Sequence, residues 1–150
     1  MKTPSGRFAG GMWLTAAACA ALSTRCAMPE RIAVAEIDGL WQEPVELVLP
    51  NADTVGCYDW QLFVRGNERL AADRFSLQIT VLTPDSLRFS EPVTMQLPAP
   101  AATPLLREAS IDYRRRVRLA AVGNYRVRIA PAQPTAGIDA VGIQIVKTEN

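Results

Sequence analysis

Few residue types in this chain are suited to chemistry, and their spacing favours no catalytic group. The 150 residues include 3 cysteines and 15 aspartates and glutamates, but no histidine. Without histidine, Ser-His and Cys-His nucleophile systems, histidine-based zinc sites and most general-base schemes near neutral pH are excluded. The sequence also lacks a CxxC pair, a phosphate-binding glycine loop and a zinc-protease motif.

Carboxylates are the remaining groups that could act in catalysis. A glycosidase needs two of them on either side of one bond, and Asp53, Asp59 and Asp85 could meet in space. Acids scattered over an exposed surface also form such pairs by chance. We therefore expect no enzymatic activity, no metal and no cofactor.

Arginines form the most distinctive cluster of charge. Five of them fall on the polar positions of two successive alternating segments: Arg114, Arg116, Arg118, Arg126 and Arg128. If these segments pair across the short turn at Gly123, the guanidiniums share one patch. That patch would dock phosphate-bearing lipid, lipopolysaccharide or an acidic partner, because guanidinium groups bind such anions bidentately. The more ordinary interpretation is a solvated face relieved by neighbouring acids such as Glu108 and Asp112.

Residues 1–25 have the three parts of a secretory signal. Lys2 and Arg7 give a positive start without acids, and an uncharged apolar run follows from Phe8 to Ser23. That run is short for a permanent transmembrane helix, and no second run in the sequence reaches that length. The pattern predicts a signal peptide that is removed on export. Its removal takes three of the 16 basic residues and none of the 15 acids, which argues against a nucleic-acid partner.

Two cysteines are candidates for lipid attachment at the end of this leader. Cys26 follows Leu22-Ser23-Thr24-Arg25, with leucine and small residues placed roughly as a lipoprotein signal requires. Cys19 follows three alanines, but cleavage there would leave half of the apolar run on the mature chain. We prefer Cys26, with Cys19 second and ordinary cleavage after an alanine third. The two or three acyl chains of a bacterial lipoprotein would hold the protein firmly on a membrane.

The third cysteine, Cys57, depends on that choice. If Cys26 is acylated and Cys19 is discarded, Cys57 is left alone, and a small buried apolar role at a strand start suits it. With either other cut, Cys26 and Cys57 could form a disulfide in the oxidising envelope.

Beyond the leader, hydrophobic residues alternate with polar ones in seven segments. Each segment predicts an antiparallel strand with one face in water. The runs are Val45 to Leu49, Tyr58 to Arg65, Phe75 to Val81, Val93 to Leu97, Ile111 to Leu119, Tyr125 to Ile129 and Val141 to Ile145. Short turn signals separate them, and the proline-rich stretch from Pro98 to Pro104 suits a crossing between two sheets.

This spacing predicts one all-β domain, an antiparallel β-sandwich of seven or eight strands, of immunoglobulin-like or jelly-roll type. We expect the sandwich over residues 45–150, the signal peptide over 1–25 and an anchor-proximal arm over 26–44. Two side chains break the alternation. Arg115 falls on the apolar face, which favours a β-bulge over a stem that crosses the core rim. Phe63 falls on the polar face, where it would be covered by the arm or mark a contact patch.

The mature chain resembles the gliding-motility lipoprotein GldH family of Bacteroidota. The resemblance rests on Cys26 a short distance before Trp41, and on a series of segments along the chain. These are Pro44 to Leu47, Asp53, Tyr58 to Arg65, Tyr113 to Leu119, Gly123 to Val127 and Gly137 to Lys147. Arg25 and the loop from Gly66 to Arg74 depart from the family's pattern.

The resemblance implies an envelope lipoprotein that serves gliding and the associated secretion machinery, with no catalytic residue. We therefore expect a non-enzymatic accessory or scaffold protein, anchored by lipid on the periplasmic side of the outer or inner membrane. It would contact other envelope proteins of a motility or secretion assembly. The alternative is a ligand-binding sandwich for carbohydrate or for a polyanion such as lipopolysaccharide. Carbohydrate would need exposed aromatic residues, for which Trp41, Trp60 and Phe63 are the candidates.

Overall fold

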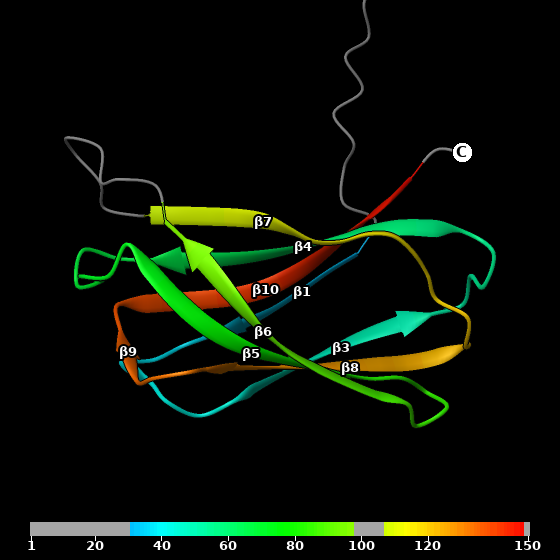
Figure 1. Ribbon diagram of the computed structural model, residues 1–150, viewed down its shortest axis with the longest axis horizontal. Coiled ribbons are helices and arrows are strands. Elements are labelled where there is room, and N and C mark those ends of the chain that lie inside the picture. Colours follow the sequence, from blue (N-terminus) through cyan, green and yellow to red (C-terminus); the bar gives the residue numbers. More distant parts are fainter. Residues whose placement is uncertain (1–30, 98–106, 149–150) are drawn as a thin grey trace, which may run out of the picture.

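The computed structural model describes residues 31–97 and 107–148, and these fold into ten strands. The strands are β1 (Arg31–Glu36), β2 (Leu40–Trp41), β3 (Val45–Asn51), β4 (Cys57–Gly66), β5 (Arg74–Leu82), β6 (Arg88–Gln96), β7 (Arg107–Arg118), β8 (Gly123–Pro131), β9 (Thr135–Ala136) and β10 (Ile138–Lys147). Two four-stranded sheets stack face to face, as Figure 1 shows. The all-β sandwich predicted from the alternation is confirmed, and each of the seven predicted runs lies in or overlaps a strand.

The strands pair as one long nested hairpin. β5 pairs with β6 at its tip, and moving outward β4 pairs with β7, β3 with β8, β2 with β9 and β1 with β10, all antiparallel. Along the chain the long strands change sheet at every step except between β5 and β6, which gives the orders β1-β10-β4-β7 and β3-β8-β5-β6. Eight long strands wound in this way form a jelly roll, which decides between the two predicted topologies.

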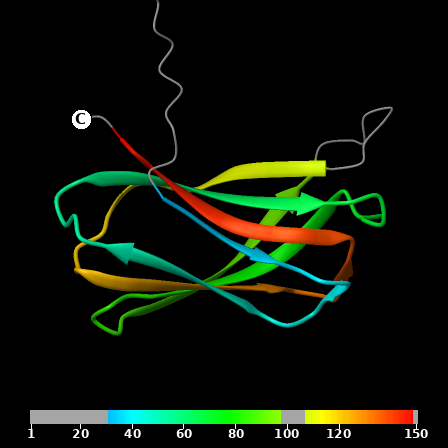
Figure 2. The same cartoon turned by 180° about the vertical axis from the view of Figure 1, so that it is seen from behind.

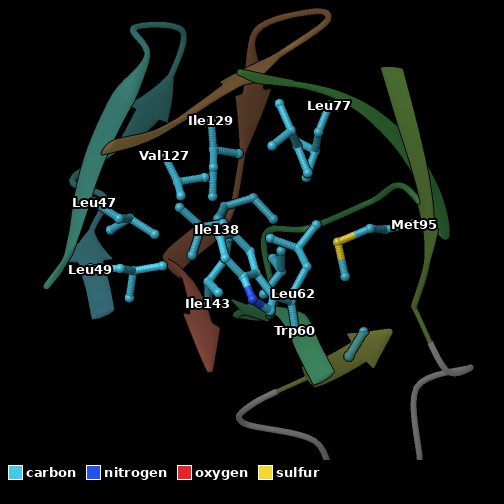
Figure 3. Packing of buried hydrophobic residues seen from close by; sticks show 14 of the residues in the cluster. Leu47, Leu49, Trp60, Leu62, Leu77, Met95, Val127, Ile129, Ile138 and Ile143 are labelled. Atoms are coloured by element: carbon cyan, nitrogen blue, oxygen red, sulfur yellow. The ribbon is translucent and has the colours of Figure 1, made fainter. Parts of the chain in front are cut away.

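The core lies between the inner faces of the two sheets. Figure 3 shows Leu47, Val127 and Leu77 of the second sheet directed toward side chains of the first sheet, among them Trp60 and Ile143. Alternation produces this arrangement, because every second residue of a strand points to the same face. Burial of these side chains, at about 25 cal/mol per Å² of apolar surface, is the main force that holds the sheets together.

The predicted arm over residues 26–44 is wrong for the part that the structure describes. Residues 31–36 form β1, which pairs along its whole length with β10 and is an edge strand of the first sheet. Trp41 of β2 is 2% exposed and belongs to the core. Figure 2 shows β1 and β3 side by side at this edge of the sandwich. The alternation in Arg31–Glu36 is weak because alanines occupy inward positions, so a strand was not predicted there.

Two features of β7 agree with the sequence analysis. Its neighbour along the chain, β6, lies in the other sheet, as expected if residues 98–104 cross between sheets; that stretch lies outside the described residues. The bulge predicted at Arg115 is also present. Tyr58 pairs with Val117 but Trp60 pairs with Arg114, so two residues of β7 face Asp59 alone.

A close approach of backbones makes glycine necessary at residue 137. Gly137 has φ +83°, and a Cβ there would lie 2.3 Å from the backbone nitrogen of Leu70. Gly39 has a similar φ of +70°, yet a Cβ there would meet nothing within 4 Å. The two glycines therefore share backbone strain but differ in crowding.

We expect Gly39→Ala to lower the free energy of unfolding by about 1 kcal/mol, the cost of a left-handed conformation for an L residue. Gly137→Ala should cost about 3 kcal/mol or more, because the loop that carries Leu70 must also move. Urea denaturation of both variants measures the difference. Equal losses would show that the close approach to Leu70 is not present in solution.

Candidate functional site

The five arginines predicted to share one patch do not do so. Arg114, Arg116 and Arg118 lie on β7 in the first sheet, whereas Arg126 and Arg128 lie on β8 in the second. β7 pairs with β4, and β8 lies between β3 and β5, so the two strands are not hydrogen-bonded neighbours. The short turn at Gly123 therefore crosses from one sheet to the other and does not form a hairpin. The prediction of one docking patch is therefore wrong.

Several of these arginines have acidic neighbours. Arg114 Nη2 donates to Glu91 Oε1 at 2.5 Å, and Arg126 Nε lies 3.8 Å from Glu46 Oε1. Arg116 has φ +53° in the bulge, and its backbone N–H donates to Asp59 at 2.7 Å. Arg128 is directly opposite Glu46 in the ladder. The outer face of the second sheet therefore resembles the solvated, partly neutralised surface that was the more ordinary interpretation.

The three aspartates considered for catalysis are each held by different partners. Asp53 accepts hydrogen bonds in the loop between β3 and β4, Asp59 accepts from Arg116, and Asp85 accepts from Thr83 Oγ1 at 2.5 Å in the β5–β6 turn. Among the described residues, no group of three or more histidine, cysteine, aspartate or glutamate side chains is arranged to hold a metal ion.

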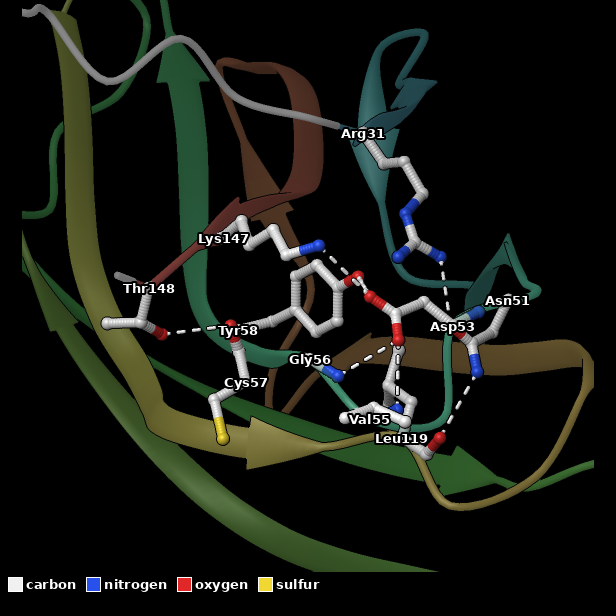
Figure 4. A network of polar contacts seen from close by, with 10 residues as sticks. All are labelled: Arg31, Asn51, Asp53, Val55, Gly56, Cys57, Tyr58, Leu119, Lys147 and Thr148. Carbon is white, nitrogen blue, oxygen red and sulfur yellow. Dashed lines mark hydrogen bonds and ion pairs between the residues drawn. The ribbon is translucent and has the colours of Figure 1, made fainter. Parts of the chain in front are cut away.

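Asp53 is the centre of a polar network where β1 enters the sandwich (Figure 4). Its carboxylate accepts from the backbone N–H groups of Val55 and Gly56, both at 2.9 Å, and from the Tyr58 hydroxyl at 2.7 Å. Lys147 Nζ lies 3.1 Å away. Four donors favour the ionised form, and the N–H of Gly56 contributes most to holding the pKa of Asp53 far below its usual value.

The same network joins the first and last described strands. Arg31 at the start of β1 lies over the Tyr58 ring at 5.0 Å, and Lys147 at the end of β10 lies 5.9 Å from its centroid. Arg31 also donates to Asn51 Oδ1 at 3.4 Å, and Asn51 in turn donates to the carbonyl groups of Leu119 and Ala121. These contacts hold the β3–β4 loop against the end of β10, which is a structural role.

A cleft along the other edge of the two sheets was not predicted. It reaches Leu119 and Ala121, whose carbonyl groups accept from Asn51 of the network. It has a volume of about 390 Å³ and lies between the edge strands β6 and β7, one from each sheet. Figure 1 shows β6 running at a steep angle to β7. The cleft lies beside the β5–β6 turn and is lined mainly by apolar side chains, with Trp60 among them. No periodicity signals such an opening, because it depends on the angle between sheets.

One polar contact joins the two edge strands beside the cleft. Glu91 of β6 accepts from the Tyr113 hydroxyl at 2.6 Å and from Arg114 of β7. Burial of the phenol, with a smaller effect of Glu91, raises the pKa of Tyr113 to about 12, so the hydroxyl keeps its proton and remains a donor. This contact joins β6 to β7 beside the cleft.

The aromatic residues considered for carbohydrate do not form an exposed row. Trp41 and Trp60 are 2% and 3% exposed and lie in the core. Phe63 is half-buried on the outer face of the first sheet, where a Cβ at Gly142 would lie 2.4 Å from its ring. Phe63 therefore covers the backbone of Gly142, and this contact accounts for an aromatic residue on the polar face.

The candidate lipid-attachment residues, Cys26 and Cys19, lie outside the described residues. Cys57 begins β4, half-buried and as a free thiol, and its carbonyl accepts from Thr148 N at 2.9 Å. Within residues 31–97 and 107–148, no helix is long and apolar enough to cross a membrane.

Comparison with known proteins adds no relative. No family model matches the chain, and no curated protein shows significant similarity to it.

The Asp53 network predicts a specific titration. Because the pKa of Asp53 is lowered in the folded state, its stabilising contribution is complete above the ordinary aspartate pKa of about 3.9 and is lost as the pH falls below it. Carbon NMR of the Asp53 carboxyl should show it still ionised at pH values below about 3.9, the ordinary aspartate pKa. Tyr58→Phe removes one donor and should raise this pKa.

Tyr113→Phe is the matched control, because it removes a hydroxyl that donates to Glu91 instead and should leave the Asp53 titration unchanged. Titration of Asp53 near its ordinary value in the unaltered protein would contradict the network.

Proposed function

We propose that this protein is a non-enzymatic accessory lipoprotein of the cell envelope, tethered through Cys26 and working by contact with other envelope proteins. This is the role that the resemblance to the GldH family implies. The tether, the envelope location and the motility-associated assembly are parts of the same proposal.

The supporting observation is the position and surface of β1. It begins at Arg31, five residues after Cys26, and is paired along its length with β10. A chain of five residues spans at most about 17 Å, so a lipid on Cys26 would keep the start of β1 within that distance of the bilayer surface. β1 is an edge strand, and its outward side chains Ile32 and Val34 are 54% and 50% exposed. An exposed apolar pair on an edge strand is a suitable contact for another protein.

The ligand-binding alternative receives less support from the geometry in the two forms considered. A polyanion would need the five arginines together, and they lie on strands of different sheets. Carbohydrate would need exposed stacked aromatic residues, and both candidate tryptophans are buried.

The tether itself is tested by Cys26→Ser. The variant should lose labelling by a fatty-acid probe and move from the membrane fraction to the soluble fraction, because the acylated thiol is absent. Cys19→Ser is the matched control and should remain labelled and membrane-bound. If Cys19→Ser abolishes labelling and Cys26→Ser does not, the lipid is attached to Cys19. If neither variant is labelled by the probe, the proposed lipid anchor is excluded.

The contact role is tested by a photo-crosslinking residue at Val34, examined in the organism's own membranes. We expect one or a few discrete products, and none from the same residue placed at Thr94, which is exposed on the outer face of the second sheet. A flexible insertion of about 20 residues between Cys26 and Arg31 should reduce the Val34 products, because β1 is then no longer held at the membrane. Products that are equal at both positions would contradict a specific contact through β1.

A further inference from the structure

A cleft between β6 and β7 leaves apolar side chains of the sandwich exposed to solvent. Phe89 shares the inward parity of Val93 and Met95, yet it is 57% exposed, whereas Met95 at the other end of β6 is fully buried. Leu87, in the preceding turn, is 55% exposed. An inward phenylalanine without a covering sheet presents apolar surface that a ligand would shield from water.

The cleft is shaped as a binding site for an apolar group. Its floor is formed by the buried side chains of Trp60, Leu119 and Tyr125, and Val81 and Val117 form part of its walls. The volume of about 390 Å³ lies toward the lower end of the range of small-molecule sites, roughly 300 to 1,000 Å³, which suits one narrow chain.

The polar groups of the cleft favour an anion at its mouth. Arg114 is paired with Glu91, and Asp85 accepts from Thr83, so these charged groups already have partners. Arg118 also lines the cleft, is exposed, and forms no ion pair with any residue in the described part of the chain. The indole N–H of Trp60 likewise has no acceptor among those residues. A guanidinium beside apolar walls is suited to a carboxylate joined to a hydrocarbon chain.

Addition of a partner strand is disfavoured on both sides of this opening. β7 is interrupted by the bulge at Arg115 and Arg116, and β6 carries Pro92, which has no backbone N–H to donate. These features block regular pairing along the edges but leave the space between the sheets accessible.

We propose that the cleft between β6 and β7 binds a long-chain fatty acid, with the hydrocarbon chain over Trp60 and Phe89 and the carboxylate at Arg118. This inference does not rest on the proposed function, because it uses only the geometry of the sandwich.

The test uses quenching of tryptophan fluorescence by a long-chain fatty acid brominated along its chain, below its critical micelle concentration. The full chain carries Trp13→Phe, which leaves Trp41 and Trp60 as reporters, and Cys26→Ser, which removes the proposed lipid. We expect saturable quenching that Trp60→Phe largely removes and Trp41→Phe preserves, because Trp60 lines the cleft and Trp41 lies in the β2–β9 pair.

Two further variants test the cleft without altering the core. Ala120 is exposed at the edge of the cleft, so Ala120→Phe should fill the opening and abolish saturable quenching. Arg118→Gln should weaken binding of the acid about tenfold, as expected for loss of a charged hydrogen bond. It should not affect binding of the methyl ester of the same acid. Arg128→Gln makes the same change of charge on β8 and should have no effect.

Several outcomes would overturn the proposal. Absence of saturable quenching, or quenching that survives Ala120→Phe in a variant folded by circular dichroism, would exclude the cleft. Equal effects of Arg118→Gln and Arg128→Gln would show that the overall charge of the protein, and not a contact at Arg118, accounts for binding of the acid. Binding only to vesicles of anionic phospholipid would indicate surface adsorption. If the protein forms a dimer that Ala120→Phe dissociates, a second copy of the chain is the occupant of the cleft. If the acylated protein does not bind the fatty acid, the occupant is the protein's own lipid.

Discussion

Nested antiparallel pairing is the constraint on which the rest of this structure depends. Each strand from β1 to β5 finds its partner in the reverse order along the chain, from β10 to β6. Because the long strands change sheet at every step except between β5 and β6, the same pairing also brings two apolar faces together. Backbone hydrogen bonding and hydrophobic burial are thereby satisfied by one winding of the chain, and the structure needs neither a disulfide nor a metal within the described residues to explain its core.

The two open sides of the sandwich are closed by different means. Near β1 and β3, the side is covered by β2 and by the network around Asp53, whose donors come from the adjoining loop and from the last strand. Near β6 and β7, the contact through Glu91 spans the gap, and Phe89 remains exposed beyond it. A fixed polar network on one side and an apolar opening on the other make the first side a framework and the second the place where a ligand could be accepted.

Much of the fold followed from the sequence, but little of the site did. Alternation located seven strands, and the displaced parity of Arg115 revealed the bulge. The missed strand β1 has alanines on its inward positions, so its apolar period is faint. The prediction of an arginine patch was wrong because β7 and β8, which are adjacent in sequence, were assumed to pair, whereas the jelly roll places them in opposite sheets. The cleft depends on the angle between β6 and β7, which arises from the twist of whole sheets and is not encoded in local spacing.

The pairing of β1 with β10 also has a mechanical consequence. Arg31 pairs with Ile145, so β1 begins at the same end of the sheet at which β10 ends. Arg31 and Lys147, at these two strand ends, both lie near the Tyr58 ring. Tension applied between the two ends of the chain would load the hydrogen bonds of this ladder one after another, in the manner of a zipper, rather than all at once in shear. A force applied to the segment before β1 would therefore detach β1 from β10 first. Single-molecule stretching would register that event at low force, before the remaining strands of the sandwich unfold.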